Sequence, residues 1–201
     1  MNINVLTTFI IAGILFLMLA YMNRGVSNNS NELIVSQSKQ AQKIDIQSII
    51  SNDFPKIGFD FNTSIDSLIV EADSSKIVFK SNLDNSSDGS IERVTWEFST
   101  DDVTSTSNPN DKILRRTVDS DITEILLGVT TFRIDYYDSY GSTTPLSTPL
   151  STVDIDNLRQ IQVTIEVQSA ELVSPTYGGD SNYITTIWTK RFTPRNLTSN
   201  L

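Results

Sequence analysis

The sequence of 201 residues contains no cysteine and no histidine. Without cysteine there is no disulfide, no thiolate nucleophile and no Cys-ligated zinc or iron–sulfur site. Without histidine the chain lacks the commonest general base near neutral pH and the commonest ligand of transition metals. A Ser-His-Asp hydrolase is therefore excluded, and an enzyme would depend on carboxylates, lysine or tyrosine. The sequence also lacks paired-carboxylate and phosphate-loop motifs, so we predict no catalytic residue, no cofactor and no metal ligand.

Positive charge is scarce as well. The chain has 15 Lys and Arg residues against 24 Asp and Glu residues, which gives a formal net charge of −9. Binding to nucleic acid depends on clustered Lys and Arg side chains that neutralise phosphates. We therefore predict no nucleic-acid partner. The length suits one domain with a substantial core and one additional element.

Long apolar runs are limited to one, which extends from Val5 to Met22 and carries no charge. About 18 residues of helix span roughly 27 Å, close to the ~30 Å hydrocarbon core of a bilayer. The segment is predicted to be a transmembrane helix that contacts membrane lipid. A cleavable signal peptide is the main alternative, but it would have a basic start and a small-x-small cleavage site, which "MNINV" and "LAYMNRG" do not provide. A buried core helix is disfavoured because every face is apolar.

A second, amphipathic helix is predicted after a polar break at Asn23 to Asn31. Asn29 and Glu32 have the spacing of a capping box, and Pro55 forbids continuation of the helix. Aliphatic residues recur loosely at helical spacing, namely Leu33, Ala41, Ile44, Ile49 and Ile50. One face should be buried against the domain that follows. A disordered stalk is the alternative, and the aliphatic residues up to Phe54 argue against it.

From residue 55 onward, short β-branched and aromatic runs alternate with turn residues, which is typical of antiparallel strands. Turns or loops are expected at Asp88-Gly89, Asp101–Asp111, Gly141–Asn157 and Gly178-Gly179. Strands are expected at Ser75–Leu83, Ile91–Thr100, Lys112–Val118, Thr130–Asp138, Arg159–Gln168 and Tyr183–Phe192.

These observations predict an α+β fold in which an N-terminal helix packs on an antiparallel sheet. The chain divides into an N-terminal tail (1–4), a transmembrane helix (5–22), a polar break (23–31), an amphipathic helix (32–54) and a β-rich domain (55–201).

The stretch "LLGVTTFRIDYYDSYG", Leu126 to Gly141, combines three tyrosines with two aspartates. A metal or sugar site is one interpretation. Asp135 alternates with Phe132, Ile134 and Tyr136, which places its side chain on the opposite, solvent-facing side of a strand. The stretch also lacks the ligand spacing of a hard-cation loop. We therefore predict a strand that runs into a turn at Asp138, with partly buried tyrosines whose hydroxyls meet water.

The order of these parts resembles the type IV pilin family, and more narrowly the J-type minor pseudopilins of type II secretion systems. Asp53, Phe54 and Gly58 match the family's "D-hydrophobic-x-x-x-G" segment at the end of the helix. The family's "V-T-Y-x-hydrophobic", "L-x-R", "F-x-hydrophobic-x-Y-Y-D-x-x-G" and "V-x-V-x-hydrophobic" segments are similar to Val94–Phe98, Leu114–Arg116, Phe132–Gly141 and Ile161–Ile165.

The resemblance implies a structural, non-catalytic subunit that packs with other pilin-like or pseudopilin subunits in a secretion or pilus system. It also implies a single-pass protein of the cytoplasmic (inner) membrane with an extracytoplasmic C-terminal domain, although Arg24, Lys39 and Lys43 weakly favour the opposite orientation. The prepilin features, a basic leader followed by Gly, an aromatic or Met, and a Glu at the fifth mature position, do not occur. We therefore expect a divergent, uncleaved relative.

The main alternative function is a membrane-tethered, adhesin-like β-sandwich whose Ser/Thr-rich loops bind a ligand. Helix packing distinguishes the two: a pilin-like subunit lays its helix against the sheet, whereas a tethered sandwich uses it as a stalk.

Overall fold

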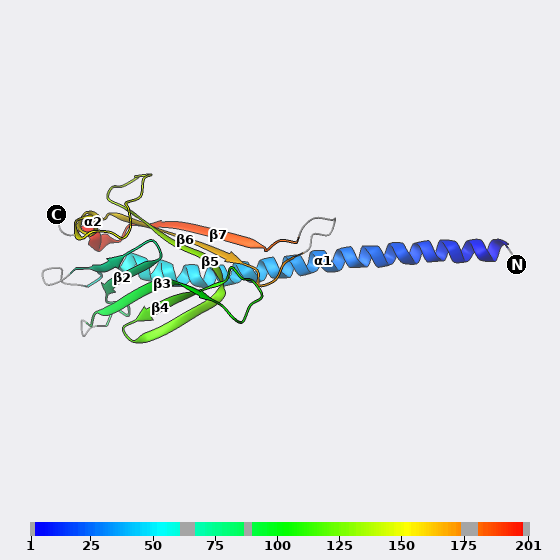
Figure 1. Ribbon diagram of the computed structural model, residues 1–201, viewed down its shortest axis with the longest axis horizontal. Helices are drawn as coiled ribbons and strands as arrows, with labels where there is room; N and C mark the ends of the chain where they lie inside the picture. Colours follow the sequence, from blue (N-terminus) through cyan, green and yellow to red (C-terminus); the bar gives the residue numbers. More distant parts are fainter. Residues whose placement is uncertain (1–2, 61–66, 87–89, 174–180, 199–201) are drawn as a thin grey trace.

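A single long helix runs out of a β-rich domain in the computed structural model, which describes residues 3–60, 67–86, 90–173 and 181–198 (Figure 1). Helix α1 covers Ile3–Asp53 without interruption. It gives way to a 3₁₀ turn, η1, at Phe54–Lys56. Pro55 lies in this turn and has no backbone N–H to continue the α-helical hydrogen bonding, so the helix ends where the sequence predicts.

The predicted polar break is wrong, because Asn23 to Asn31 is helical throughout. Asn29 therefore lies inside a helix and does not begin a second one. One helix of 51 residues replaces the two that the sequence predicts. Its apolar N-terminal part is consequently joined by continuous helix to the part that enters the domain.

Seven antiparallel strands form one sheet, in which each strand pairs with the next along the chain. A short helix α2 (Thr152–Asn157) precedes the sixth strand, and a 3₁₀ turn η2 (Arg195–Thr198) follows the seventh. The strands are β1 (Ile69–Ala72), β2 (Lys76–Ser81), β3 (Glu92–Asp102), β4 (Lys112–Val118), β5 (Asp121–Tyr137), β6 (Gln160–Gln168) and β7 (Thr185–Phe192).

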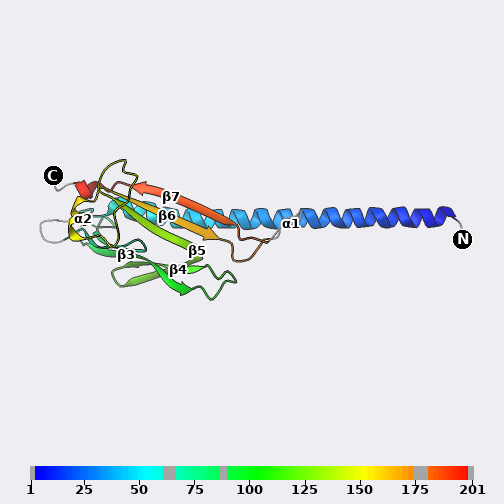
Figure 2. The ribbon, with the colours of Figure 1, turned by 45° about the horizontal axis from the view of Figure 1, so that its top comes forward.

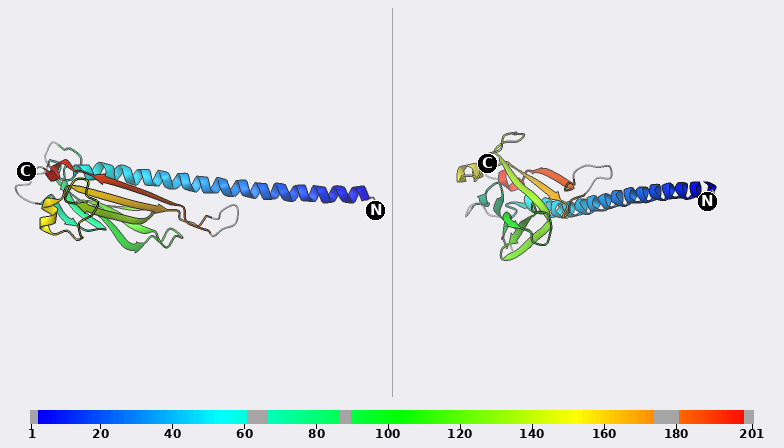
Figure 3. Two further views of the ribbon diagram at one scale, coloured as in Figure 1. Left: turned by 90° about the horizontal axis from the view of Figure 1, so that it is seen from above. Right: turned by 45° about the vertical axis from the view of Figure 1, so that its right-hand side comes forward.

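Strand β5 gives the sheet its curl. Its first part pairs with β4, from Asp121 to Ile125 and again at Val129, and its second part pairs with β6, from Val129 to Tyr137. Between them lies Gly128, whose φ of 76° belongs to a region that favours glycine. The curl brings the β1–β2 turn against the second half of β5, where the Ile134 N–H donates to the Ser74 carbonyl at 2.8 Å. Figures 2 and 3 show the curled sheet beside the C-terminal part of α1.

The core lies between this sheet and the last turns of α1. Ile46, Ile50 and Phe54 are at most 1% exposed and belong to the same apolar cluster as Trp96 and Ile165. The Phe54 ring lies 6.1 Å from that of Phe79 and 5.4 Å from that of Phe192, measured between centroids. The end of α1 is therefore part of the domain's core.

Most strands begin and end close to the predicted residues, with a few differences. The sequence did not predict β1, and β5 begins nine residues before the expected start at Thr130. Gly141–Asn157 is not wholly an exposed loop, because it contains α2 and the buried Leu150. The turns expected at Asp88-Gly89 and Gly178-Gly179 include residues outside the described part of the chain.

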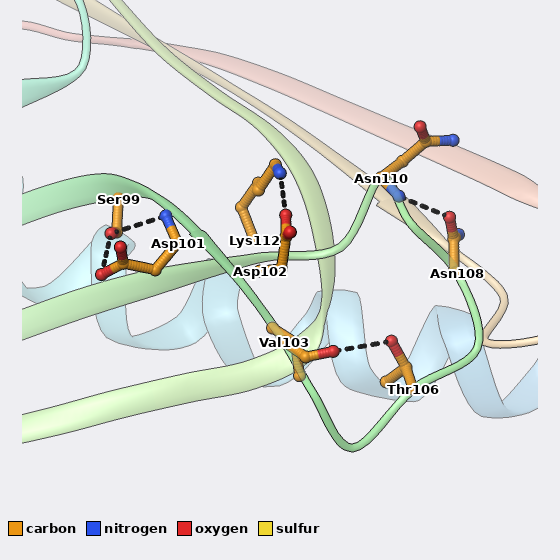
Figure 4. Close-up of polar contacts among 8 residues, drawn as sticks. All are labelled: Ser99, Asp101, Asp102, Val103, Thr106, Asn108, Asn110 and Lys112. Atoms are coloured by element: carbon orange, nitrogen blue, oxygen red, sulfur yellow. Dashed lines mark hydrogen bonds and ion pairs between the residues drawn. The ribbon is translucent and has the colours of Figure 1, made fainter.

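The β3–β4 connection, expected as a polar loop from Asp101 to Asp111, is more ordered than an exposed loop. Strand β3 continues to Asp102, which pairs with Lys112 at the start of β4 (Figure 4). Asn108 is 2% exposed: its amide donates to the Ser169 carbonyl at 2.9 Å, and its side-chain oxygen accepts from the Asn110 N–H. The loop thus connects the β3–β4 hairpin to the end of β6.

Candidate functional site: the N-terminal helix and its attachment to the sheet

The first part of α1 is an apolar surface that no described part of the domain covers. The segment Leu6–Ser27 has 22 residues, a mean hydropathy of 2.0 and no buried share, and its length and composition suffice to cross a membrane. A signal sequence near an N-terminus has the same properties. The side chains of Phe9, Phe16 and Tyr21 are 71–76% exposed. Such a surface requires an apolar environment.

Further along α1, apolar side chains continue on the face that points away from the sheet. Val26, Leu33 and Ile44 are 61%, 63% and 58% exposed. They are seven and eleven residues apart, so they lie almost in line along the helix. Ile34 is 63% exposed beside this row. We call Val26, Leu33, Ile34 and Ile44 the outer row of α1.

The buried face of α1 differs from the one that the sequence predicts. Of the predicted residues, Leu33, Ala41, Ile44 and Ile49 are exposed, and only Ile50 is buried. The buried positions are Ile46, Ile50, Asp53 and Phe54, which follow one another at helical spacing. The aliphatic residues of the sequence pattern thus lie on two different faces of α1. The sheet covers only the face that carries Ile46, Ile50 and Asp53.

Asp53, the last residue of α1, is fully buried and attaches the helix to two strands. Its Oδ2 accepts from the Trp96 indole N–H of β3 at 3.0 Å and from Arg116 Nε of β4 at 2.7 Å. Arg116 also donates through a terminal nitrogen to Asp53 Oδ1 at 3.1 Å, which completes a bidentate pair. A carboxylate at a helix C-terminus faces the negative end of the helix dipole, so these donors are needed to hold it there.

The Asp53–Trp96–Arg116 cluster joins three segments that the family resemblance had singled out separately. Asp53 comes from the end of the helix, Trp96 from the "V-T-Y"-like strand and Arg116 from the "L-x-R"-like strand. Local sequence patterns do not predict contact among them, because Trp96 and Arg116 lie 43 and 63 residues from Asp53. The resemblance was the signal that marked these positions. The arrangement fixes the direction in which α1 leaves the domain.

Gly58 completes the attachment by reversing the chain just beyond the helix. Its φ is 72°, and a Cβ atom there would come within 2.8 Å of a methyl group of Leu68. Its N–H donates to the Lys80 carbonyl of β2 at 2.8 Å. A side chain is therefore opposed both by the backbone conformation and by the packing.

The stretch from Leu126 to Gly141 forms the second part of β5 and a turn at Gly141, whose φ is 76°. Asp138 is exposed beyond the strand end, as predicted. Asp135 does lie on the face opposite Ile134, but the prediction of solvent exposure is wrong. It is 9% exposed, and its Oδ2 accepts from Arg133 at 2.8 Å.

The prediction that the tyrosine hydroxyls meet water is wrong for Tyr136. Tyr136 is fully buried, and its hydroxyl donates to the Asp73 carbonyl at 2.9 Å rather than to water. Burial, followed by the nearby carboxylates of Asp73 and Glu71, raises the pKa of Tyr136 well above its ordinary value. Tyr137 is 3% exposed under the Arg191 guanidinium, which lies 3.8 Å from its ring centroid. Within residues 3–60, 67–86, 90–173 and 181–198, no three acidic side chains gather as a metal site would require.

Comparison with protein-family models, with curated proteins and with solved structures finds no match to this chain.

Proposed function

We propose that this protein is a membrane-anchored structural subunit of a pilin-like or pseudopilin-like assembly, which acts by helix and domain packing. In this proposal the segment Val5 to Met22 lies in the cytoplasmic membrane and the β-rich domain lies outside the cytoplasm. The supporting observation is one helix with three consecutive environments: an uncovered apolar segment, an uncovered outer row, and a C-terminal end that is built into the core.

The outer row of α1 is the part that favours a protein partner. Lipid can satisfy the residues up to Ser27, and the sheet covers Ile46, Ile50 and Phe54. Leu33, Ile34 and Ile44 lie between these regions and are 58–63% exposed. Aliphatic side chains in this position are best covered by the helix of a neighbouring subunit.

The tethered-module alternative is less well supported. A stalk would end before the domain, whereas α1 contributes Ile46 and Ile50 to the core and the η1 turn that follows it contributes Phe54. The seven strands form one curled sheet rather than the two facing sheets of a sandwich. Both observations favour a subunit in which helix and sheet form one packing unit.

Site-directed crosslinking tests the proposal, and the absence of native cysteine makes every introduced thiol unique. Single Cys variants at Leu33, Ile34 and Ile44 would be crosslinked in native membranes and the adducts identified by mass spectrometry. We expect discrete adducts with other single-pass proteins that have an apolar N-terminal helix. Val35→Cys should react less, because Val35 is half-buried on the sheet side of α1.

A Cys at Ser147, in the exposed part of the connection before α2, is the matched control on the domain. It should give weaker adducts than the outer row. If only the Ser147 variant crosslinks, or if the adducts are glycans or soluble ligands, the tethered-module function is supported instead.

A further inference from the structure

One stretch of α1 is helical although its residues favour other conformations. The segment Asn23–Asn31 reads "NRGVSNNSN" and includes one glycine, two serines and four asparagines. These residue types have low helix propensity, since glycine loses backbone entropy and Ser and Asn side chains compete for backbone hydrogen bonds. The local sequence therefore opposes the helix that the structure contains.

No tertiary contact compensates for this in the described side chains. Arg24, Val26, Ser27 and Ser30 are exposed, and Gly25 is only half-buried. Within residues 23–27 and 30, no side chain makes a hydrogen bond or an ion pair to another part of the chain. The turns of α1 from Ile46 onward are held in the core by the sheet, whereas the described side chains of Asn23–Asn31 add no such contact. The helical hydrogen bonds of this stretch are therefore easier to open than those at the C-terminal end of α1.

We infer that Asn23–Asn31 is a conformational hinge of α1. In the lone chain the helical hydrogen bonds of this stretch open repeatedly while both flanking parts stay helical, and the β-rich domain swings relative to the anchored segment. Neighbouring helices that cover the outer row would favour the continuous form seen in the structure, because they order the helix on the domain side of the hinge. This closing step rests on the proposed function, whereas the opening step does not.

Amide hydrogen exchange on the full chain in lipid nanodiscs tests the hinge. We expect the amides of Ser27–Asn31 to exchange at least tenfold faster than those of Ser48–Asp53, whose turn is held in the core. Replacing Gly25, Ser27 and Ser30 together by alanine should slow exchange of the stretch by about thirtyfold, because the helical form gains propensity at three positions.

Gly13→Ala is the matched control, since a Cβ at Gly13 meets no atom within 4 Å and lies in the apolar segment. It should leave exchange of Ser27–Asn31 unchanged. Exchange as slow as in Ser48–Asp53, or exchange that the triple alanine variant does not alter, overturns the hinge. Failure of the proposed function is read separately, from the absence of outer-row adducts in native membranes.

Discussion

At the scale of single residues, the attachment of α1 depends on the buried pair of Asp53 and Arg116. Arg116→Met removes both guanidinium bonds and leaves a carboxylate that is fully buried and bonded to Trp96. Removing one partner of a buried pair costs about 3–5 kcal/mol, and we expect about 2–4 kcal/mol because Arg116 is 21% exposed. Urea unfolding of the full chain in detergent, followed by tryptophan fluorescence, measures this change.

Arg115→Met is the neighbouring control. Arg115 forms its ion pairs with Glu124 and Asp101 at the surface, where such pairs contribute little. The urea midpoint of unfolding of the Arg115→Met variant should stay close to that of the unmodified protein. Equal losses in the two variants would show that the buried pair does not secure the helix.

Tyr136 makes a pH-dependent contribution at the same scale. Because burial raises its pKa well above the ordinary value of 10.0, the folded state holds the phenolic proton more tightly than the unfolded state. This contribution is fully present below about pH 10 and is lost as the pH rises further. The free energy of unfolding should fall by up to about 1.4 kcal/mol per pH unit in that range.

Comparing the protein with its Tyr136→Phe variant isolates this effect. The hydrogen bond to Glu71 raises the pKa of Lys76, so Lys76 also loses stabilising charge at alkaline pH, but it is present in both proteins. The variant should have a lower free energy of unfolding at pH 8, since the bond to the Asp73 carbonyl is lost, and a shallower decline above pH 10. Parallel declines would contradict the assignment.

At the scale of elements, β6 shows most clearly how a sequence pattern positions a strand. Ile161, Val163 and Ile165 are fully buried, and the residues between them are half-buried. Val163→Asp would place a charge in the core, with an expected loss of about 3–5 kcal/mol. Thr164→Asp replaces a side chain on the other face that contacts Thr189 at 3.1 Å, and it should be mild. Similar losses in thermal melts would mean that the two faces are misassigned.

Elements with a strong local pattern could be predicted, and those set by distant contacts could not. Alternation alone located β6 and the centre of β3, and Pro55 located the end of α1. The start of β5 lacks clear alternation, because Ile122 and Leu126 are exposed while Ile125 is buried. In α1 the aliphatic residues lie on two faces, and only the curled sheet decides that Ile46 rather than Ile44 is buried.

The candidate site was predicted only in its apolar segment. Composition and length predicted Val5 to Met22 as the membrane segment, and the part of α1 that could cross a membrane is Leu6–Ser27. The Asp53–Trp96–Arg116 cluster brings together side chains from three separate elements. The hydrophobic periodicity within each element does not predict which of its residues contact the other two. The continuity of α1 through Asn23–Asn31 contradicts local propensity, and conflicts of this kind between local and global structure are expected at functional or strained positions.

At the scale of the whole molecule, charge and apolar surface are separated along the long axis. Helix α1 has equal numbers of basic and acidic residues, so the net charge of −9 belongs to the residues that follow it. The two parts therefore suit different environments. The acidic domain favours water, and the uncovered apolar segment favours lipid.

This separation predicts how the protein partitions between membrane and solution. Washing membranes with alkaline carbonate should leave the full chain in the membrane, because burying the apolar segment in lipid outweighs the solubility of the domain. A version that begins at Asn31 keeps Ile46, Ile50 and Phe54 for its core and should be released. N-terminal sequencing of the protein from its native membranes shows whether a peptidase removes the apolar segment. Release of both versions, or a mature chain that lacks Leu6–Ser27, would show that the segment is not a permanent anchor and that the domain acts in solution.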